Sequence, residues 1–331
     1  MDPVGFTVMK PIKDIELDAA NGFEAMMEEL FKAGGFGAKN LARGYQILLE
    51  SLQDPDCFNF LSFPACICAT GTRGVIREMV KRRLCDCIIT TCGMLDHDLA
   101  RTWKNYYHGE FIADEVKLHR QGINRLGNIY VPNDSYGIVL ERKMQPILRS
   151  IYKKQKEFST REIIYAFGKA LEEEKNAESS ITYWAYKNNI PIFVPGITDG
   201  AFGSQLWMFT QEHSDFKINL FKDEQDLSEV VFKAKKTGAL MLGGGISKHH
   251  VIWWNQYKGG LDYAVYITTA MEQDGSLSGA RMREAVSWGK VKEKGQYVTV
   301  DGDVTILLPF LAKALIEKGR FKPTRKGVKI I

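Results

Sequence analysis

Six short apolar runs, each followed by a helix-like pattern, constrain the fold of this chain more than any other feature of its sequence. The runs are nearly continuous and do not alternate with polar residues, which is typical of strands covered on both faces in a parallel sheet. Their alternation with helical segments predicts an α/β fold, with a doubly wound, mostly parallel sheet and helices on both faces. The runs span residues 57–63, 86–91, 190–195, 239–242, 263–268 and 297–300.

The segment before the first run is predicted as an N-terminal helical extension covering residues 1–56. Phe23, Met27 and Leu30 repeat at the spacing of one helix face, and Gly34-Gly35 ends that helix. No internal repeat and no low-complexity linker follows, so residues 57–331 are predicted as one α/β domain.

Local signals place some boundaries within that domain. Ser159 and Glu162 form a capping box, and a last helix from about Thr305 is closed by Gly319. The segment 113–156 is harder to place, because residues 121–128 and 131–135 read as loop.

Composition excludes several classes of protein. The formal net charge is only +4, and basic residues cluster only at residues 81–83 and in the tail 318–329, which does not indicate nucleic-acid binding. The tail is expected to be solvated, with docking on an acidic partner as the alternative. No apolar run of about 18 residues and no secretory signal is present, so we expect a cytoplasmic protein without membrane contact.

All six cysteines fall between residues 57 and 92. Their C-x-C spacing differs from the C-x-x-C of common zinc sites, so we predict no metal site. In a strand Cys85 and Cys87 would face the same side, which leaves a thiolate pair as the alternative to reduced core cysteines.

Candidate site residues follow the apolar runs, because ligands bind at the carboxyl ends of the strands in an open parallel sheet. Gly243-Gly244-Gly245 follows one run. Glycines let backbone N–H groups approach a phosphate without Cβ atoms in the way, although a tight turn would use them as well. The G-x-G-x-x-G fingerprint is absent, so an ordinary Rossmann dehydrogenase is not indicated.

A second candidate group combines histidine, tryptophan and lysine. His249 and His250 follow the glycines, and the segment 274–290 is rich in Gly, Ser, Asp and Glu before it ends on Trp288 and Lys290. A lysine that forms a Schiff base must be neutral, and burial against an aromatic wall favours the neutral amine. From composition alone, a surface position is the favoured interpretation of Lys290.

Six motifs resemble those of the deoxyhypusine synthase family, and they run in the family's order across residues 58–311. Three form a C-terminal signature: Tyr263-Ala-Val-Tyr-Ile-Thr-Thr-Ala, Asp274-Gly-Ser to Gly279-Ala, and Glu284-Ala-Val-Ser-Trp-Gly-Lys290. The others are Gly122-Ile-Asn-Arg-Leu-Gly-Asn, Pro191-Ile-Phe-Val-Pro-Gly-Ile-Thr-Asp-Gly and Leu242-Gly-Gly-Gly-Ile-Ser-Lys-His-His.

The resemblance implies an NAD-dependent aminobutyl transferase with a Rossmann-like NAD-binding catalytic domain. In this family NAD takes a hydride from spermidine, and a lysine attacks the resulting imine and releases 1,3-diaminopropane. The aminobutyl group then passes to a lysine of the translation initiation factor 5A precursor, and the stored hydride reduces the final imine. Lys290 matches the covalent nucleophile, and the resemblance also implies a homotetramer with sites finished by residues from two chains.

The same matching implies two sets of binding residues. A cationic polyamine needs carboxylates and aromatic faces, since these replace its water. Those implied for the polyamine are Asp96, His97, His249, Asp274, Gly275, Glu284 and Trp288. Those implied for NAD are Thr91, Cys92, Gly93, Asp199, Gly243, Gly244, Gly245, Thr269, Ala270 and Asp303.

Some positions depart from the familiar eukaryotic pattern and resemble a divergent, archaeal-type branch. Ser204 and Leu277 stand where carboxylates that hold the polyamine are often found. A homospermidine-type synthase, with a small diamine as acceptor, is therefore one alternative, and a catalytically silent NAD- or polyamine-binding subunit is another. The carboxylates expected to replace the missing ones are Asp96, Asp199, Asp274 or Glu284.

Overall fold

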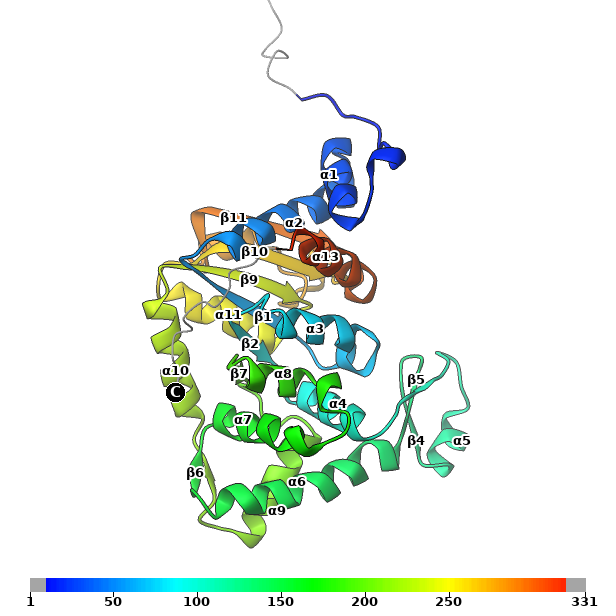
Figure 1. Ribbon diagram of the computed structural model, residues 1–331, viewed down its shortest axis with the longest axis vertical. Helices are drawn as coiled ribbons and strands as arrows, with labels where there is room; N and C mark the ends of the chain where they lie inside the picture. The colour runs from blue at the N-terminus through cyan, green and yellow to red at the C-terminus, as the bar shows by residue number, and fades with distance from the viewer. Residues whose placement is uncertain (1–9, 320–331) are drawn as a thin grey trace, which may run out of the picture.

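The computed structural model describes residues 10–319 and is built around a six-stranded parallel sheet (Figure 1). Each of the six apolar runs is a strand of this sheet, so the predicted fold class is confirmed. Numbered along the chain, the strands lie in the order 6-5-4-1-2-3, which is that of the doubly wound dinucleotide-binding folds. From edge to edge they are β11 (Val291–Asp301), β10 (Leu261–Thr268), β9 (Lys236–Leu242), β1 (Cys57–Phe63), β2 (Cys87–Thr90) and β7 (Ile192–Phe193).

Alternate residues of each strand enter two separate apolar cores, which explains why the runs are continuous. In β1, Leu61 and Phe63 face a core formed with α2 (Phe36–Gln53), α3 (Thr72–Lys81) and α13 (Val304–Lys318). Phe60 faces the opposite core, which is formed with α10 (Leu220–Lys233) and α11 (Ile246–Gln256).

The helices around β2 and β7 extend the domain away from α1 and the β10–β11 edge (Figure 1). The capping box at Ser159 is present at the start of α7, as predicted. These helices are α4 (Cys92–Trp103), α6 (Gly137–Tyr152), α7 (Thr160–Ala170), α8 (Ile181–Lys187) and α9 (Ala201–Glu212), accompanied by the paired strands β6 (Glu157–Phe158) and β8 (Lys217–Ile218). Short 3-10 helices are η2 (Leu17–Ala19), η3 (Cys66–Ala69), η4 (Asn133–Ser135), η5 (Leu171–Glu173), η6 (Ala177–Ser179) and η7 (Glu272–Asp274).

A small antiparallel sheet projects from the domain as an arm (Figure 1). It contains β3 (Tyr107–His108), β4 (Ile123–Leu126) and β5 (Ile129–Pro132), with α5 (Glu115–Arg120) beside them. The interpretation of residues 121–128 and 131–135 as loop was therefore wrong where β4, β5 and η4 form. Gly127 takes φ +61° in the two-residue turn between β4 and β5, a conformation that hairpin turns require and glycine provides.

The N-terminal helices pack against the rest of the chain. The predicted helix is α1 (Phe23–Ala33), and it ends at Gly34 in the left-handed conformation. α2 contacts the sheet closely, since a Cβ on Gly44 would lie 3.2 Å from Val265 Cγ1. The division of the chain at residue 56 stays a prediction.

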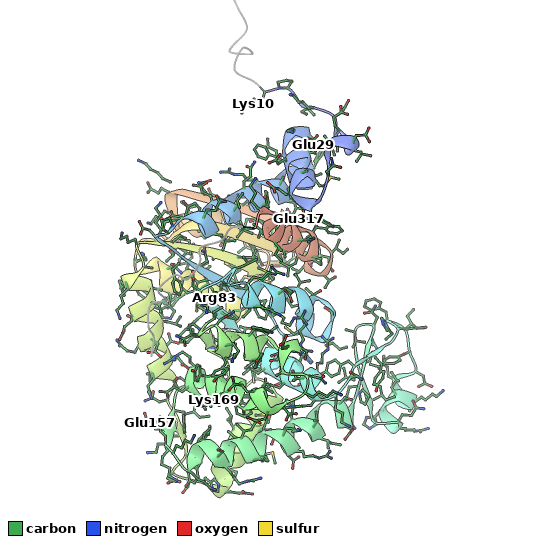
Figure 2. The ribbon with its side chains drawn as sticks, in the orientation of Figure 1. Lys10, Glu29, Arg83, Glu157, Lys169 and Glu317 are labelled. Atoms are coloured by element: carbon green, nitrogen blue, oxygen red, sulfur yellow. The ribbon has the colours of Figure 1, made fainter. Side chains whose placement is uncertain are left out.

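The last helix holds the first one in place. Glu317, near the end of α13, accepts hydrogen bonds from the N–H groups of Phe23 at 2.7 Å and Glu24 at 3.1 Å (Figure 2). Phe23 also packs on Phe310, with ring centres 5.6 Å apart. Gly319 closes α13 with φ +66°, as predicted, and most of the basic tail lies outside the described residues. Among residues 10–319, no helix combines the length and apolar character that crossing a membrane requires.

Candidate active site

The strand order creates a topological switch point between β1 and β9. The chain leaves β1 toward β2 on one side and leaves β9 toward β10 on the other, and ligands bind at such points in open parallel sheets. The turn after β9 lies against the exit of β1, because a Cβ on Gly243 would be 3.4 Å from Pro64 Cγ. The glycine run thus lies where a ligand is expected.

Two helices begin beside this switch point. Gly243 and Gly245 take φ values of +69° and +76°, which glycine favours, and Gly245 directly precedes α11. On the other side of β1, Thr91 directly precedes α4, and a Cβ on Gly93 would approach Ala65 Cβ to 2.8 Å. The N-terminal turns of two helices, whose leading N–H groups lack partners within the helix, therefore flank the exit of β1.

Thr91 tests whether a dinucleotide fits here. Its Oγ1 is buried and has no hydrogen-bond partner within the part of the chain that the structure describes. An unpaired buried hydroxyl costs about 1–3 kcal/mol, so a ribose hydroxyl or phosphate oxygen at this position would relieve the cost. Burial, and to a smaller extent the carboxylates of Asp96 and Asp199, raise the pKa of the Cys92 thiol. Asp199 is therefore close to Cys92, and the loop after β7 reaches the same edge of the sheet.

The remaining residues implied for NAD follow the last two strands. Thr269 and Ala270 come directly after β10, and the Ala270 N–H donates to Thr268 Oγ1 at 3.0 Å. Asp303 begins α13, where its Oδ1 accepts from Thr305 N at 2.6 Å. All ten residues thus lie along the carboxyl edge of one sheet.

Lys290 lies just before β11 with its amine between two tryptophan rings. Nζ is 5.0 Å from the ring centre of Trp288 and 5.7 Å from that of Trp253. Only 8% of Lys290 is exposed, whereas Trp288 and Trp253 are 59% and 41% exposed. His249 stacks on Trp253 with ring centres 5.5 Å apart. The amine is therefore buried while the aromatic side of the cluster is open.

Lys290 interacts electrostatically with the ionisable side chains at the start of α11. Burial, and then the positive charge of Lys290, lower the pKa of His249. Burial lowers the pKa of Lys248 to about 8, with the Glu284 carboxylate opposing this shift and Lys290 adding to it. Both shifts favour uncharged nitrogen atoms. Lys248 and His249 are on the first turn of α11, so this helix connects the lysine cluster to the glycine turn.

Comparison with known proteins identifies the family. The deoxyhypusine synthase profile matches residues 25–315 of the chain. A protein of Picrophilus torridus named probable deoxyhypusine synthase is 52% identical over 308 residues, which cover 93% of this chain and 97% of that protein. The chain belongs to the deoxyhypusine synthase family.

Further deoxyhypusine synthase matches agree. A probable deoxyhypusine synthase of Thermoplasma acidophilum is 53% identical over 302 residues, 91% of this chain and 96% of that protein. A crystal structure assigned as a deoxyhypusine synthase of Entamoeba histolytica shares the fold, with a TM-score of 0.64, 20% identity, and coverage of 94% of this chain and 99% of that one. The predicted archaeal-type family is confirmed. The matches support deoxyhypusine synthase as the function, and not the homospermidine-type alternative.

The structure brings some deoxyhypusine synthase residues to Lys290 and leaves others apart. His249 and Trp288 lie beside it and the Glu284 carboxylate acts on the neighbouring Lys248, but Asp96 and His97 point into the protein. Asp96 is 1% exposed and accepts from the N–H groups of residues 201 and 202 and from the Tyr136 hydroxyl, all within 2.9 Å. It therefore holds the start of α9.

His97 has a comparable structural place. Its Nδ1 lies 3.0 Å from the Tyr106 hydroxyl, and its ring contacts Tyr136. Burial lowers the pKa of His97 to about 4. It is therefore a neutral side chain that packs α4 against the base of the arm.

Other positions singled out from the sequence lie at the end of η7 and on α9. Asp274 accepts from Ser276 N at 2.7 Å, and Gly275 takes φ +72° in the same exposed turn. Ser204 is exposed on α9, and its hydroxyl donates to the Gly200 carbonyl at 3.1 Å. Within the described part of the chain, these positions make no hydrogen bond or ion pair with Lys290.

Trp253 and Lys248 were not among the predicted site residues, although Trp253 follows the two histidines in the sequence. His249 and Trp253 are four residues apart on α11, a spacing that places them on one helix face, and this signal was available. Nothing in the sequence indicates that Lys248 is buried, because lysine is normally exposed.

Two other features lie outside this site. Burial raises the pKa of Cys85 to about 12 and that of Cys87 well above its usual range, which disfavours a thiolate pair. Residues 10–319 hold no cluster of metal-ligand side chains.

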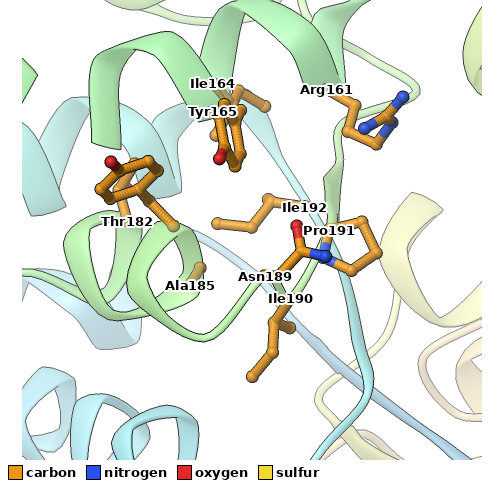
Figure 3. A pocket seen from close by; sticks show the side chains of 10 residues that line it. Arg161, Ile164, Tyr165, Thr182, Ala185, Asn189, Ile190, Pro191 and Ile192 are labelled. Atoms are coloured by element: carbon orange, nitrogen blue, oxygen red, sulfur yellow. The ribbon is translucent and has the colours of Figure 1, made fainter. Parts of the chain in front are cut away.

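A cavity of about 20 Å³ lies between α7, α8 and β7, where Tyr165, Thr182 and Ile192 line it (Figure 3). It has room for about one water molecule.

Proposed function

We propose that this chain transfers the aminobutyl group of spermidine through an imine on Lys290 to a lysine of the translation initiation factor 5A precursor. The observation that supports this most strongly is the buried Lys290 amine between two tryptophan rings, next to His249. A lysine enclosed in this way is placed to form an imine with a substrate that is held against the aromatic faces.

The proposed reaction at Lys290 is a transimination, in which the lysine amine replaces the secondary amine of spermidine on the imine carbon. Oxidation of spermidine beside its secondary nitrogen gives an imine, and Lys290 Nζ adds to the imine carbon. The bond from that carbon to the secondary nitrogen then breaks, 1,3-diaminopropane leaves with a proton, and the four-carbon unit remains on Lys290 as an imine. His249 is the candidate to carry the proton, because its lowered pKa leaves the ring neutral and able to accept one.

The aromatic walls and Glu284 would recognise the polyamine. The exposed faces of Trp253 and Trp288 suit ammonium groups through cation–π contact. Glu284 is exposed beside this cluster and supplies the opposite charge that each desolvated ammonium needs. It replaces, in this proposal, a carboxylate missing at Ser204 or Leu277.

NAD is the proposed cofactor, and when bound it supplies the acceptor and later the donor of the hydride. Thr91 Oγ1, the Gly243–Gly245 turn and the first N–H groups of α4 and α11 would hold its polar groups, as argued from the unpaired hydroxyl and the two helix starts. Asp199, Thr269, Ala270 and Asp303 complete the proposed lining of the same sheet edge.

Assembly as a homotetramer in the cytoplasm is also proposed. The open tryptophan rings support it, because a hydride transfer site must exclude water and a single chain leaves Trp288 59% exposed. A second copy would close that side.

Borohydride trapping tests the proposal. The protein is incubated with spermidine and NAD, reduced, digested and analysed by mass spectrometry. We expect an aminobutyl adduct on Lys290, none without NAD, and none in Lys290→Ala. An unmodified Lys290 in protein that binds NAD would contradict the proposal and would favour a silent binding subunit.

A further inference from the structure

The connection between β10 and β11, residues 269–290, carries Glu284, Trp288 and Lys290. It contains only η7 and the four-residue helix α12 (Glu284–Ser287). Its position therefore depends on side-chain contacts made by other elements.

Lys248 makes the most unusual of these contacts. Only 1% of it is exposed, and its Nζ donates to the carbonyls of Leu277 at 2.9 Å and Ala280 at 2.6 Å. Nζ also lies 3.7 Å from the ring centre of Tyr266 on β10. A lysine amine has three donors and no acceptor when charged, so two carbonyls and a ring face occupy it fully.

Tyr266 continues the same contact. Its hydroxyl donates to the Ser278 carbonyl at 2.6 Å, between the two carbonyls bound by Lys248. Gly244 in the turn after β9 packs against the same residue, since a Cβ there would lie 2.2 Å from Ser278 Oγ. Residues 277–280 are thus fastened between α11, β10 and the glycine turn.

The fastened segment leads directly to the lysine cluster. Met282 N donates to Thr299 Oγ1 at 3.0 Å, and Glu284 N donates to the Arg281 carbonyl at 3.0 Å as α12 begins. Lys290 N then donates to the Ala285 carbonyl at 2.9 Å. A shift of residues 277–280 would therefore move Glu284 and Trp288 relative to Lys290.

We infer that Lys248 is a positioning residue, which fixes residues 277–280 through its buried amine and thereby sets Glu284 and Trp288 in place around Lys290. Its role is separate from that of Lys290, because its nitrogen is saturated by protein carbonyls and does not face the aromatic opening. The consequence for catalysis rests on the proposed function, whereas the anchoring of the segment does not.

Two substitutions of the same chemical kind isolate this role. Lys248→Met removes both hydrogen bonds while keeping an unbranched chain. Lys258→Met is the matched control, because Lys258 also donates to a backbone carbonyl, that of Ala234, and burial also lowers its pKa, but it lies beyond the far end of α11. Lys248→Arg keeps a charged donor, and Tyr266→Phe keeps the cation while removing one hydrogen bond.

Hydrogen exchange in the full-length protein without ligands tests the anchoring. Residues 276–283 should exchange about ten-fold faster or more in Lys248→Met and at the wild-type rate in Lys258→Met. Lys248→Arg should recover part of the protection. Equal exchange in wild type and Lys248→Met, or an arginine variant no better than methionine, would overturn the inference.

Borohydride trapping at saturating NAD tests the catalytic consequence. A misplacement of roughly 1 Å slows reaction on the order of a hundred-fold, so Lys248→Met should form the Lys290 adduct ten- to a hundred-fold more slowly and raise the KM for spermidine. NAD affinity should change by less than about three-fold, because β10 holds the glycine turn through the hydrogen bond that the Gly243 N–H donates to the Ile267 carbonyl. Trapping at the wild-type rate would reject the positioning role. Absence of the adduct in wild type would refute the proposed function alone, and the exchange comparison would still decide the role of Lys248.

Discussion

Gly244→Ala perturbs the candidate site without changing any charge or hydrogen-bonding side chain. The new Cβ would lie 2.2 Å from Ser278 Oγ and 2.4 Å from Ser278 Cα. Since carbon atoms pack at about 3.5–4.0 Å, the glycine turn and residue 278 must separate by roughly 1 Å. The Ser278 Cα is backbone, so no rotamer change relieves the contact.

This separation has a calculable cost. Overpacking of this kind destabilises a protein by about 1–3 kcal/mol, and each kcal/mol lowers the melting temperature of a chain of this size by about 1–2 °C. Because the glycine turn belongs to the proposed NAD site, a displacement near 1 Å should also weaken NAD binding by about ten-fold or more. Thermal melts and equilibrium NAD titration measure both effects.

Gly74→Ala is the control for the loss of glycine flexibility. Gly74 is inside α3 with open space where its Cβ would be, so alanine there should stabilise the protein by about 0.5–1 kcal/mol and leave NAD binding unchanged. If Gly244→Ala has the same melting temperature as Gly74→Ala and binds NAD with the wild-type affinity, residue 278 does not pack on the glycine turn as described.

Three further outcomes are expected. Lys290→Arg keeps a cation but cannot become a neutral nucleophile, so transfer to the acceptor should fall by orders of magnitude while NAD still binds, and labelled acceptor at near wild-type rates would exclude the covalent mechanism. Glu284→Gln should raise the KM for spermidine more than the Kd for NAD, and equal spermidine binding by both proteins would remove Glu284 from the site. The folded-state pKa of His97 is depressed to about 4, so its neutral form contributes stability that is complete above the unfolded value of 6.5 and is lost as pH falls from 6.5 toward 4. His97→Gln should therefore lose less unfolding free energy than wild type across that window, and parallel pH profiles from urea unfolding would contradict this assignment.

The strands were predictable because burial on both faces leaves a direct trace in the sequence. The run 57–63 is β1 to the residue, and the other runs fall within three residues of their strands at most ends. β11 is the exception at its start, since it begins at Val291 and its first part, which includes Lys292 and Glu293, is not apolar. The arm was missed because β4 alternates exposed and half-buried residues and does not cover a large apolar core. It therefore leaves no run of apolar residues in the sequence.

The direction of side chains was the part that sequence could not supply. Asp96 and His97 follow a strand end, as ligand-binding residues do, but α4 begins at Cys92 and turns both inward within its second turn. Lys248 and His249 are adjacent in sequence, yet only Lys248 is enclosed by residues 277–280. Such differences depend on contacts with segments far along the chain.

The contact between Glu317 and the start of α1 has a consequence for biosynthesis. The hydrogen bonds from Phe23 and Glu24 join residues 294 and 293 positions apart, and Phe23 packs on Phe310. A ribosome releases the chain from its N-terminus, so α1 emerges long before its partner helix exists. During nearly the whole of translation, the apolar face of α1 lacks the part of its covering surface that α13 provides in the finished protein, although α2 is already present. Completion of this part of the fold therefore waits for the last helix, and a chain stopped before Val304 would leave that face without α13.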